Sequence, residues 1–165
     1  MRLYLIRHGL AIDREDPLCP PDIERFLTKK GEKLTRKAMF GLRALGVRAD
    51  AILSSSYVRA TQTARIAAEA LGFSAGKIRH TRALEPDSAA ANLFEELARM
   101  EEERIVCCGH APNLDEVVAY AVGAPSAFTH MKKAGAACLE FEGVQRGEGL
   151  LLWLHSPRVL RSFGH

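Results

Sequence analysis

Short apolar runs of strand length alternate along the chain with longer stretches whose apolar residues recur at the period of a helix. The runs that predict strands are residues 3–6, 51–53, 78–84, 105–108, 137–141 and 150–154. The stretches that predict helices are residues 32–45, 57–71, 89–101 and a segment that begins after Pro112. Strands that alternate with helices predict a three-layer α/β/α fold, in which a mostly parallel central sheet carries helices on both faces.

Glycine and serine residues mark the ends of two of these helices. Gly46 follows the helix over residues 32–45, and Gly72 closes the helix over residues 57–71. Three consecutive serines, Ser54 to Ser56, precede the second helix and offer hydroxyl groups that would cap its first turn.

The composition fits a globular protein with a core of its own. The chain has 165 residues, of which 47% are apolar and 26% are charged, and this balance predicts a single domain over residues 1–165. The net charge is +3, and the lysines and arginines are scattered among acidic residues. This pattern favours an anionic ligand without requiring nucleic acid, so we expect no nucleic-acid partner.

No apolar run reaches the roughly 18 residues that a membrane span needs, and the first apolar run is too short for a signal peptide. We therefore expect a cytoplasmic protein with no membrane partner. The cysteines Cys19, Cys107, Cys108 and Cys138 form no C-x2-C pair, which predicts reduced, structural thiols. Adjacent Cys107 and Cys108 should point to opposite faces of their strand.

Polar residues stand where two predicted strands end. Arg7 and His8 follow the first strand, and His110 follows the strand over residues 105–108. Arg59 lies in the first turn of the helix after another strand. Because open α/β sheets bind ligands at the carboxyl ends of their strands, we expect these four side chains to converge there.

A pocket of two guanidinium groups, two imidazoles and a helix N-terminus suits a dianionic phosphoryl group. Gly9 would leave room for a close approach between backbone and ligand. Ser55, Gln62 and Asn113 are candidate lining residues, although capping and ordinary helix surface explain them as well.

Three motifs occur in the order found in a known family. They are R-H-G at residues 7–9, S-S-Y-V-R-A-T-Q-T-A at residues 55–64 and G-H at residues 109–110. Together they resemble the histidine phosphatase superfamily, also called the phosphoglycerate mutase-like family. Within it, L-T-K-K-G at residues 27–31, H-A-P-N-L at residues 110–114 and the small size resemble the SixA-type phosphohistidine phosphatases.

The resemblance implies a role for each of the four converging residues. His8 would be the nucleophile, which forms a phosphohistidine enzyme that water then hydrolyses. Arg7 and Arg59 would neutralise the transferring group and disfavour protonation of His8, and His110 would donate to the phosphoryl oxygens. The resemblance implies no metal and no cofactor, because cationic side chains take that place.

The expected substrate is a phosphohistidine-bearing protein, such as a phosphorelay domain. A small-molecule phosphomonoesterase of the same superfamily is one alternative, with a small phosphorylated molecule as its partner. A non-catalytic phosphate-binding module is another, although binding alone would require only the arginines and not His8.

The sequence departs from part of the family after the third predicted strand. Members that cleave alkyl phosphates place a glutamate there in an L-x-E pattern, as general acid, whereas this chain has Leu84-Glu85-Pro86. Glu85 is a candidate acid, but a shift of one residue at a strand end turns a side chain the other way. The L-x-P form itself resembles the SixA type.

Less specific interpretations apply to several residues. Each of the four converging residues alone fits a salt bridge or a structural histidine; their joint position at strand ends favours a site. The remaining histidines fit no ligand spacing and are expected to be structural or on the surface: His80, His130, His155 and His165. Lys132 and Lys133 are either a solvated face or a docking patch. The loop over residues 13–26 is either a substrate lip or a stiff surface loop.

Overall fold

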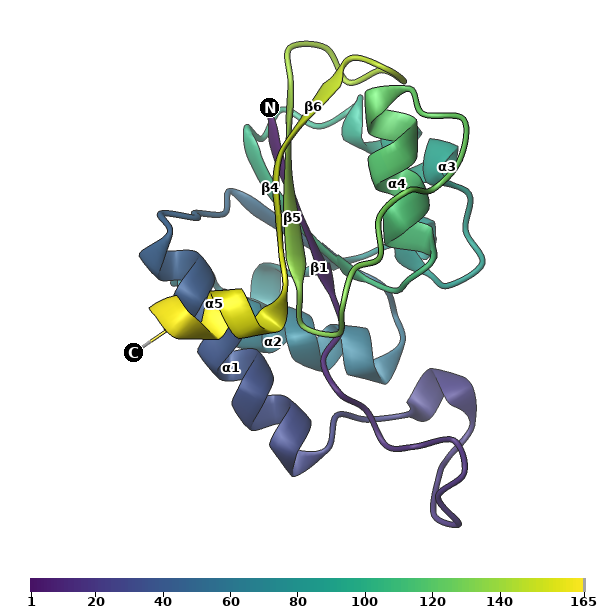
Figure 1. The fold of residues 1–165 in the computed structure, drawn as a ribbon, viewed down its shortest axis with the longest axis vertical. Helices are drawn as coiled ribbons and strands as arrows, with labels where there is room; N and C mark the ends of the chain where they lie inside the picture. Colours follow the sequence, from purple (N-terminus) through teal and green to yellow (C-terminus); the bar gives the residue numbers. More distant parts are fainter. Residues whose placement is uncertain (165) are drawn as a thin grey trace.

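The computed structural model describes residues 1–164, so His165 lies outside it. One six-stranded sheet has the order β3-β2-β4-β1-β5-β6. Figure 1 labels β1, β4, β5 and β6. The strands of the sheet are β1 (Arg2–Arg7), β2 (Ala51–Ser54), β3 (Arg79–His80), β4 (Arg104–Gly109), β5 (Ala136–Phe141) and β6 (Gly149–His155). The strands β3, β2, β4 and β1 pair in parallel, whereas β5 is antiparallel to both β1 and β6. The α/β fold with a mostly parallel sheet is confirmed; the single-domain organisation over residues 1–165 stays a prediction.

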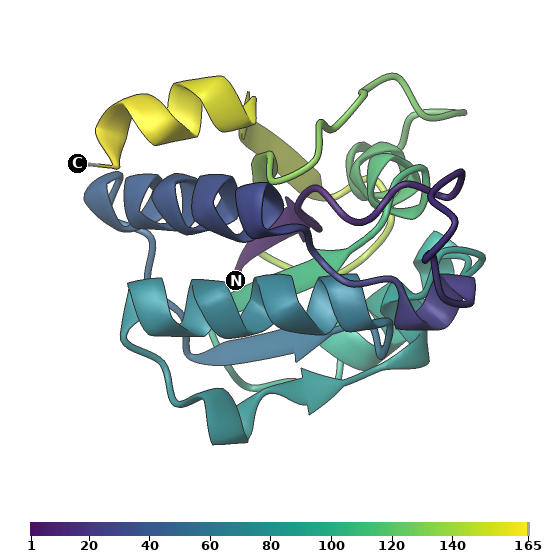
Figure 2. The same cartoon turned by 90° about the horizontal axis from the view of Figure 1, so that it is seen from below.

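Helices cover both faces of the sheet. They are α1 (Lys29–Ala44), α2 (Val58–Leu71), α3 (Ala90–Leu97), α4 (Asn113–Val122) and α5 (Pro157–Phe163), with short 3-10 turns η1 (Asp22–Glu24), η2 (Ala75–Lys77) and η3 (Arg82–Leu84). Figure 1 shows α3 and α4 on one side of the sheet and α1, α2 and α5 on the other. Figure 2 shows α1 lying between α5 and α2. This is the three-layer arrangement that the sequence predicts.

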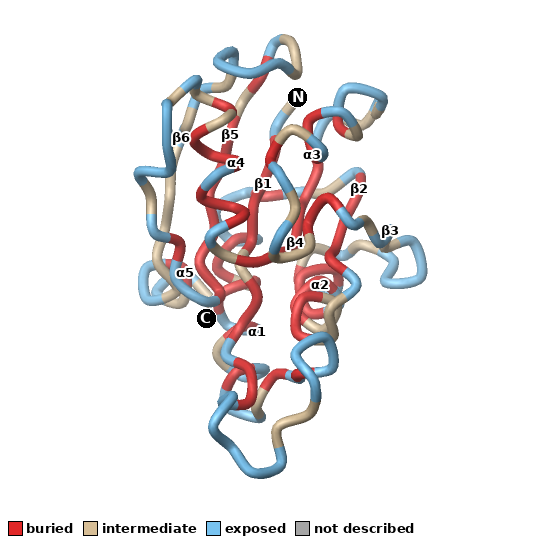
Figure 3. The backbone as a smooth tube through the Cα atoms, turned by 90° about the vertical axis from the view of Figure 1, so that its right-hand side faces the viewer, coloured by how far each residue is buried: buried red, intermediate tan, exposed pale blue. Residues whose placement is uncertain are grey.

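Alternation along the strands builds two cores. Leu3 and Leu5 of β1 pack in the cluster that contains α3 and α4, whereas Tyr4 and Ile6 pack in the cluster that contains α1 and α2. Cys107 and Cys108 likewise belong to opposite clusters, as predicted. Figure 3 shows that the buried segments lie mainly in the central strands and the helices, whereas β3 and β6 are less buried. Among the described helices, none is long and apolar enough to cross a membrane.

Local hydrogen bonds explain where the observed elements differ from the predicted ones. The strand expected over residues 78–84 is reduced to β3, because Thr81 then caps η3 by accepting from Ala83 N. Helix α1 begins earlier than predicted because Thr28 accepts from Gly31 N. The expected serine cap of α2 was wrong: Tyr57 is the N-cap residue, and no side chain caps this helix.

Helix α5 was not among the predicted elements. Its start carries a recognisable signal, since Ser156 accepts from Val159 N and Pro157 occupies the first turn. The helix packs on α1, where Gly41 allows the Leu160 carbonyl to approach the helix backbone. The close approach between these two helices therefore depends on the missing side chain of Gly41.

Replacing Gly41 with alanine tests this contact. Alanine is the better helix former by about 1 kcal/mol, but its methyl group would overlap the Leu160 carbonyl oxygen. The steric overlap should outweigh the gain in helix propensity. It should lower the free energy of unfolding by roughly 1–3 kcal/mol, as measured by urea denaturation. Lys33→Ala, on the exposed side of the same helix, should stay within about 0.5 kcal/mol of wild type. A Gly41→Ala protein as stable as wild type would contradict the packing of α5 on α1.

Candidate active site

Arg7, His8, Arg59 and His110 line one cleft of about 480 Å³. The ring centroids of His8 and His110 lie 5.1 Å apart. Nε of Arg59 lies 3.3 Å from Nε2 of His8. The structure therefore brings together the four residues that the sequence predicts to converge.

The pairing of β1 with β4 determines the positions of His8 and His110. Arg7, the last residue of β1, is opposite Gly109, the last residue of β4, in parallel register. The next residue on each strand is a histidine, and the His8 amide donates to the Gly109 carbonyl at 2.9 Å. The histidines thus leave the same edge at the same level, and the first turn of α2 brings Arg59 to them.

The hydrogen bonds of His8 define its tautomer. Nδ1 lies 2.7 Å from the Gly9 carbonyl oxygen, which can only accept, so Nδ1 carries the proton and Nε2 keeps its lone pair. Burial lowers the pKa of His8 to about 3, although the hydrogen bond to Gly9 opposes this shift. His110, Arg59 and Arg7 contribute to this lowering of the pKa, each less than burial. At neutral pH, His8 is therefore uncharged and keeps the lone pair on Nε2.

His110 is oriented by Ser55. Its Nε2 lies 2.9 Å from the Ser55 hydroxyl, which also accepts from the Tyr57 amide at 3.2 Å. In the tautomer in which that hydroxyl donates its proton to Nε2, Nδ1 of His110 carries the ring proton and is an N–H donor. Burial lowers the pKa of His110 to about 3, and the charge of Arg59 adds to the shift.

Two of the buried polar atoms that lack a partner within residues 1–164 belong to residues that line the cleft. They are Nδ1 of His110 and Nε of Arg7. Arg7 is otherwise held by donating from NH1 to the Met131 carbonyl at 2.7 Å. An unsatisfied buried donor is costly, and an anion in the cleft would offer acceptors to both groups.

The loop over residues 13–26, called the lip below, forms one wall of the cleft. Four of its residues line the cleft: Asp13, Arg14, Glu15 and Arg25. A fifth, Asp22 in η1, contacts Arg59: NH1 of Arg59 donates to the Asp22 carbonyl at 2.6 Å, and NH2 lies 3.4 Å from its carboxylate. Burial lowers the pKa of Arg59, whereas the charge of Asp22 opposes that shift. The lip is thus part of the site and not a detached surface loop.

Other predicted lining residues lie outside the cleft wall. A side chain on Gly9 would overlap the Thr35 hydroxyl in α1, so helix packing, and not room for a ligand, requires glycine there. Asn113 donates from Nδ2 to the Ser88 carbonyl at 2.6 Å and so holds the turn before α3. Ser55 acts on the site through His110.

Glu85 lies in a neighbouring hollow with Tyr57 and Asp87. Its carboxylate accepts from the Ser56 hydroxyl at 2.8 Å. Pro86 lines both this hollow and the cleft. The side chain of Glu85 is therefore engaged away from His8, and its role as an acid stays a hypothesis.

Sequence reasoning did not single out the charged residues of the lip and did not place Lys133 at the cleft. Asp22 and Arg25 belong to the lip, whose length and prolines were the only signal. Lys133 lines the cleft, because the Ala134 amide donates to the carbonyls of Arg7 and His8 and fixes this segment beside His8. Lys132, its neighbour in the sequence, is not among the residues that line the cleft.

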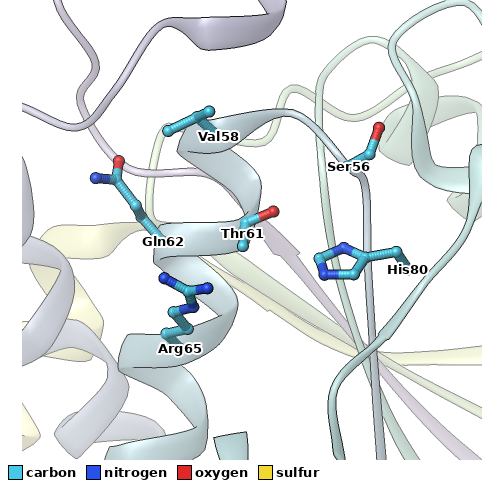
Figure 4. Close-up of a pocket in the computed structure, with 6 residues that line it drawn as sticks. All are labelled: Ser56, Val58, Thr61, Gln62, Arg65 and His80. Carbon is cyan, nitrogen blue, oxygen red and sulfur yellow. The ribbon is translucent and has the colours of Figure 1, made fainter. Parts of the chain in front are cut away.

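A second pocket, of about 410 Å³, lies against α2 and shares no residue with the cleft. Figure 4 shows the residues that line it: Ser56, Val58, Thr61, Gln62, Arg65 and His80. Gln62 has a structural role, because its side-chain oxygen accepts from the Leu27 amide at 2.7 Å. Across the described chain, no group of three or more His, Cys, Asp or Glu side chains could hold a metal ion.

Comparison with known proteins points to one family. The family model described as Histidine phosphatase superfamily (branch 1) matches residues 3–85. This range includes Arg7, His8 and Arg59. An uncharacterized protein of Picosynechococcus sp. is 37% identical over 140 residues, which cover 82% of this chain and 82% of that protein.

Solved structures share the fold along nearly the whole chain. The protein histidine phosphatase SixA complexed with tungstate has a TM-score of 0.84 and 21% identity, and the match covers 97% of this chain and 99% of that one. A mycobacterial glucosyl-3-phosphoglycerate phosphatase has a TM-score of 0.73 and 18% identity, and the match covers 94% and 98%. Identities at this level show the fold alone.

The buried neutral histidines predict a pH-dependent stability. The folded protein holds His8 and His110 with a pKa of about 3, whereas the unfolded chain takes up protons near pH ~6.5. The stabilisation is therefore complete above that pH and is lost as pH falls toward 3. The urea midpoint should be flat above pH 7 and fall steadily between pH 6 and 4. In the double variant His8→Gln/His110→Gln, the urea midpoint should fall less steeply with pH. An unchanged slope would contradict the assignment of this pH dependence to the two histidines.

Proposed function

Since the chain belongs to the Histidine phosphatase superfamily (branch 1), we propose that it hydrolyses phosphohistidine on a protein through a covalent intermediate at His8. One observation carries the proposal: the neutral imidazole of His8 presents Nε2 to the cleft beside an arginine N–H. The unpartnered donors of Arg7 and His110 support it, because a phosphoryl group would satisfy them.

The reaction has two displacements at phosphorus. In the first, Nε2 of His8 attacks phosphorus in line, the bond to the substrate nitrogen breaks, and that nitrogen takes a proton from solvent. In the second, water attacks the phosphorylated His8, inorganic phosphate leaves, and the lone pair on Nε2 is restored. Arg7, Arg59 and His110 face the oxygen atoms on which charge accumulates in both steps.

The expected substrate class follows from the leaving group. An alkyl alcohol leaves as a strongly basic alkoxide unless an acid protonates it, whereas the imidazole of phosphohistidine has an unperturbed pKa near ~6.5. Pro86 lines the cleft where related enzymes would place an acid, and Glu85 is hydrogen-bonded to Ser56. These features favour a substrate whose leaving group does not need protonation by a general acid of the enzyme.

A small-molecule phosphomonoesterase is the second candidate function. Asp13 and Glu15 bring carboxyl groups from the lip into the cleft wall. A carboxyl group within reach of the leaving oxygen would serve as general acid for an alkyl phosphate. A glucosyl-3-phosphoglycerate phosphatase shares this fold.

The covalent intermediate is testable by chemical quench. His8→Ala should abolish turnover, because it removes the Nε2 atom that attacks phosphorus in this scheme. Wild type quenched during turnover should carry a phosphate on His8 that is labile in acid and stable in base. His80→Ala, an exposed histidine outside the cleft, should retain activity. Phosphate found on a serine, or on no residue, would contradict the scheme.

Leaving-group dependence separates the two candidate functions. With no positioned acid, kcat/KM should be at least ~10² higher for phosphohistidine and activated aryl phosphates than for serine or sugar phosphates. Glu85→Gln should barely slow the phosphohistidine reaction; Asp13→Asn and Glu15→Gln test the lip carboxylates in the same way. Equal efficiency on alkyl phosphates that is lost in one of these variants would assign that residue as the acid and favour the phosphomonoesterase.

A further inference from the structure

Arg59 is held on two of its edges by different parts of the chain. Its Nε–H faces Nε2 of His8 at 3.3 Å, while its terminal nitrogens contact the carbonyl and the carboxylate of Asp22 in the lip. We propose that Asp22 is a positioning residue that directs the Nε edge of Arg59 toward the phosphoryl group transferred to His8. The inference rests on the proposed function and adds a residue to it that no sequence motif marks.

The rigid shape of the Arg59 guanidinium group links its contacts with Asp22 to its contact with His8. Its five N–H donors lie in one rigid plane. Asp22 binds the end of that plane formed by the terminal nitrogens, which leaves the edge with Nε–H for another acceptor. The nucleophilic Nε2 of His8 lies at that same edge. A phosphoryl group attached to Nε2 of His8 would replace this contact and bring its oxygen atoms beside the same N–H donor.

Asp22 is well placed to hold Arg59 because it is itself held. Its Oδ1 accepts from Arg25 and from Arg14, each at 3.1 Å. The buried side chain of Arg25 donates twice to the Ile12 carbonyl, at 3.1 and 2.7 Å. These bonds connect the end of the lip to the residue that precedes it. Partial burial raises the pKa of Asp22, but the hydrogen bond from Arg25 and the nearby cations outweigh it and lower the pKa overall. The carboxylate is therefore ionised at neutral pH.

Positioning has a kinetic signature that differs from that of a binding contact. Without Asp22, the long side chain of Arg59 regains rotamer freedom, and kcat should fall by roughly tenfold because the stabilising donor is no longer preorganised. The negative charge of Asp22 does not attract a dianionic substrate. Its loss should therefore leave KM within about twofold of wild type.

A double-mutant cycle on an aryl phosphate tests the proposal. The proteins are wild type, Asp22→Ala, Arg59→Ala and the double variant, with circular dichroism to confirm folding. If Asp22 acts through Arg59, its replacement should cost about tenfold in wild type and little in the Arg59→Ala background. Asp22→Asn, which keeps an acceptor oxygen, should recover part of the loss, and it replaces Asp22→Ala in the cycle if that variant does not fold.

Asp50→Ala is the matched control, because Asp50 also binds an arginine, Arg104, but at the opposite end of β4. It should leave kcat unchanged. Equal losses from Asp22→Ala with and without Arg59, or a raised KM with unchanged kcat, would overturn the positioning role while leaving the proposed function intact. A wild-type protein that turns over neither aryl phosphate nor phosphohistidine would overturn the proposed function and the inference together.

Discussion

The parallel pairing of β1 with β4 is the contact on which the site depends. Because Arg7 is opposite Gly109 in that register, His8 and His110 leave the sheet side by side. A shift of one residue would turn every side chain of β1 to the other face and would separate the two histidines. The buried alternation of Leu3, Leu5 and their neighbours on both faces opposes such a shift. The same apolar packing that stabilises the core therefore sets the geometry of the cleft.

Burial in the cleft would serve the proposed chemistry in two ways. It keeps His8 uncharged, so that Nε2 retains the lone pair that the proposed attack on phosphorus requires. Arg59 is buried as well, so its charge would act more strongly on a developing oxyanion than it would in water. The cost is a set of buried donors that lack partners in the described chain, on Arg7 and His110. A bound phosphoryl group would offer acceptors to these atoms and offset that cost.

The lip joins the site through charged contacts and not through apolar packing. Asp22 accepts from three arginines, of which Arg59 and Arg25 line the cleft. Leu18 and Ile23 on the same loop are exposed, so these ion pairs and the hydrogen bonds between the lip and Ile12 contribute most to its position. The position of the lip would therefore respond to the charge of a ligand that enters the cleft.

The sequence by itself determined the layers of the fold and four residues of the site, because both follow from local patterns. Alternating strands and helices dictate a three-layer sheet, and residues just past parallel strands meet at one edge. Tertiary structure alone decided the rest. Whether Gly9 serves a ligand or α1, whether Glu85 faces the cleft or Ser56, and that Asp22, Arg25 and Lys133 reach the site all depend on contacts between segments distant in sequence. Such contacts produce no periodic pattern in the sequence, because packing and charge determine which side chains meet only in the folded structure.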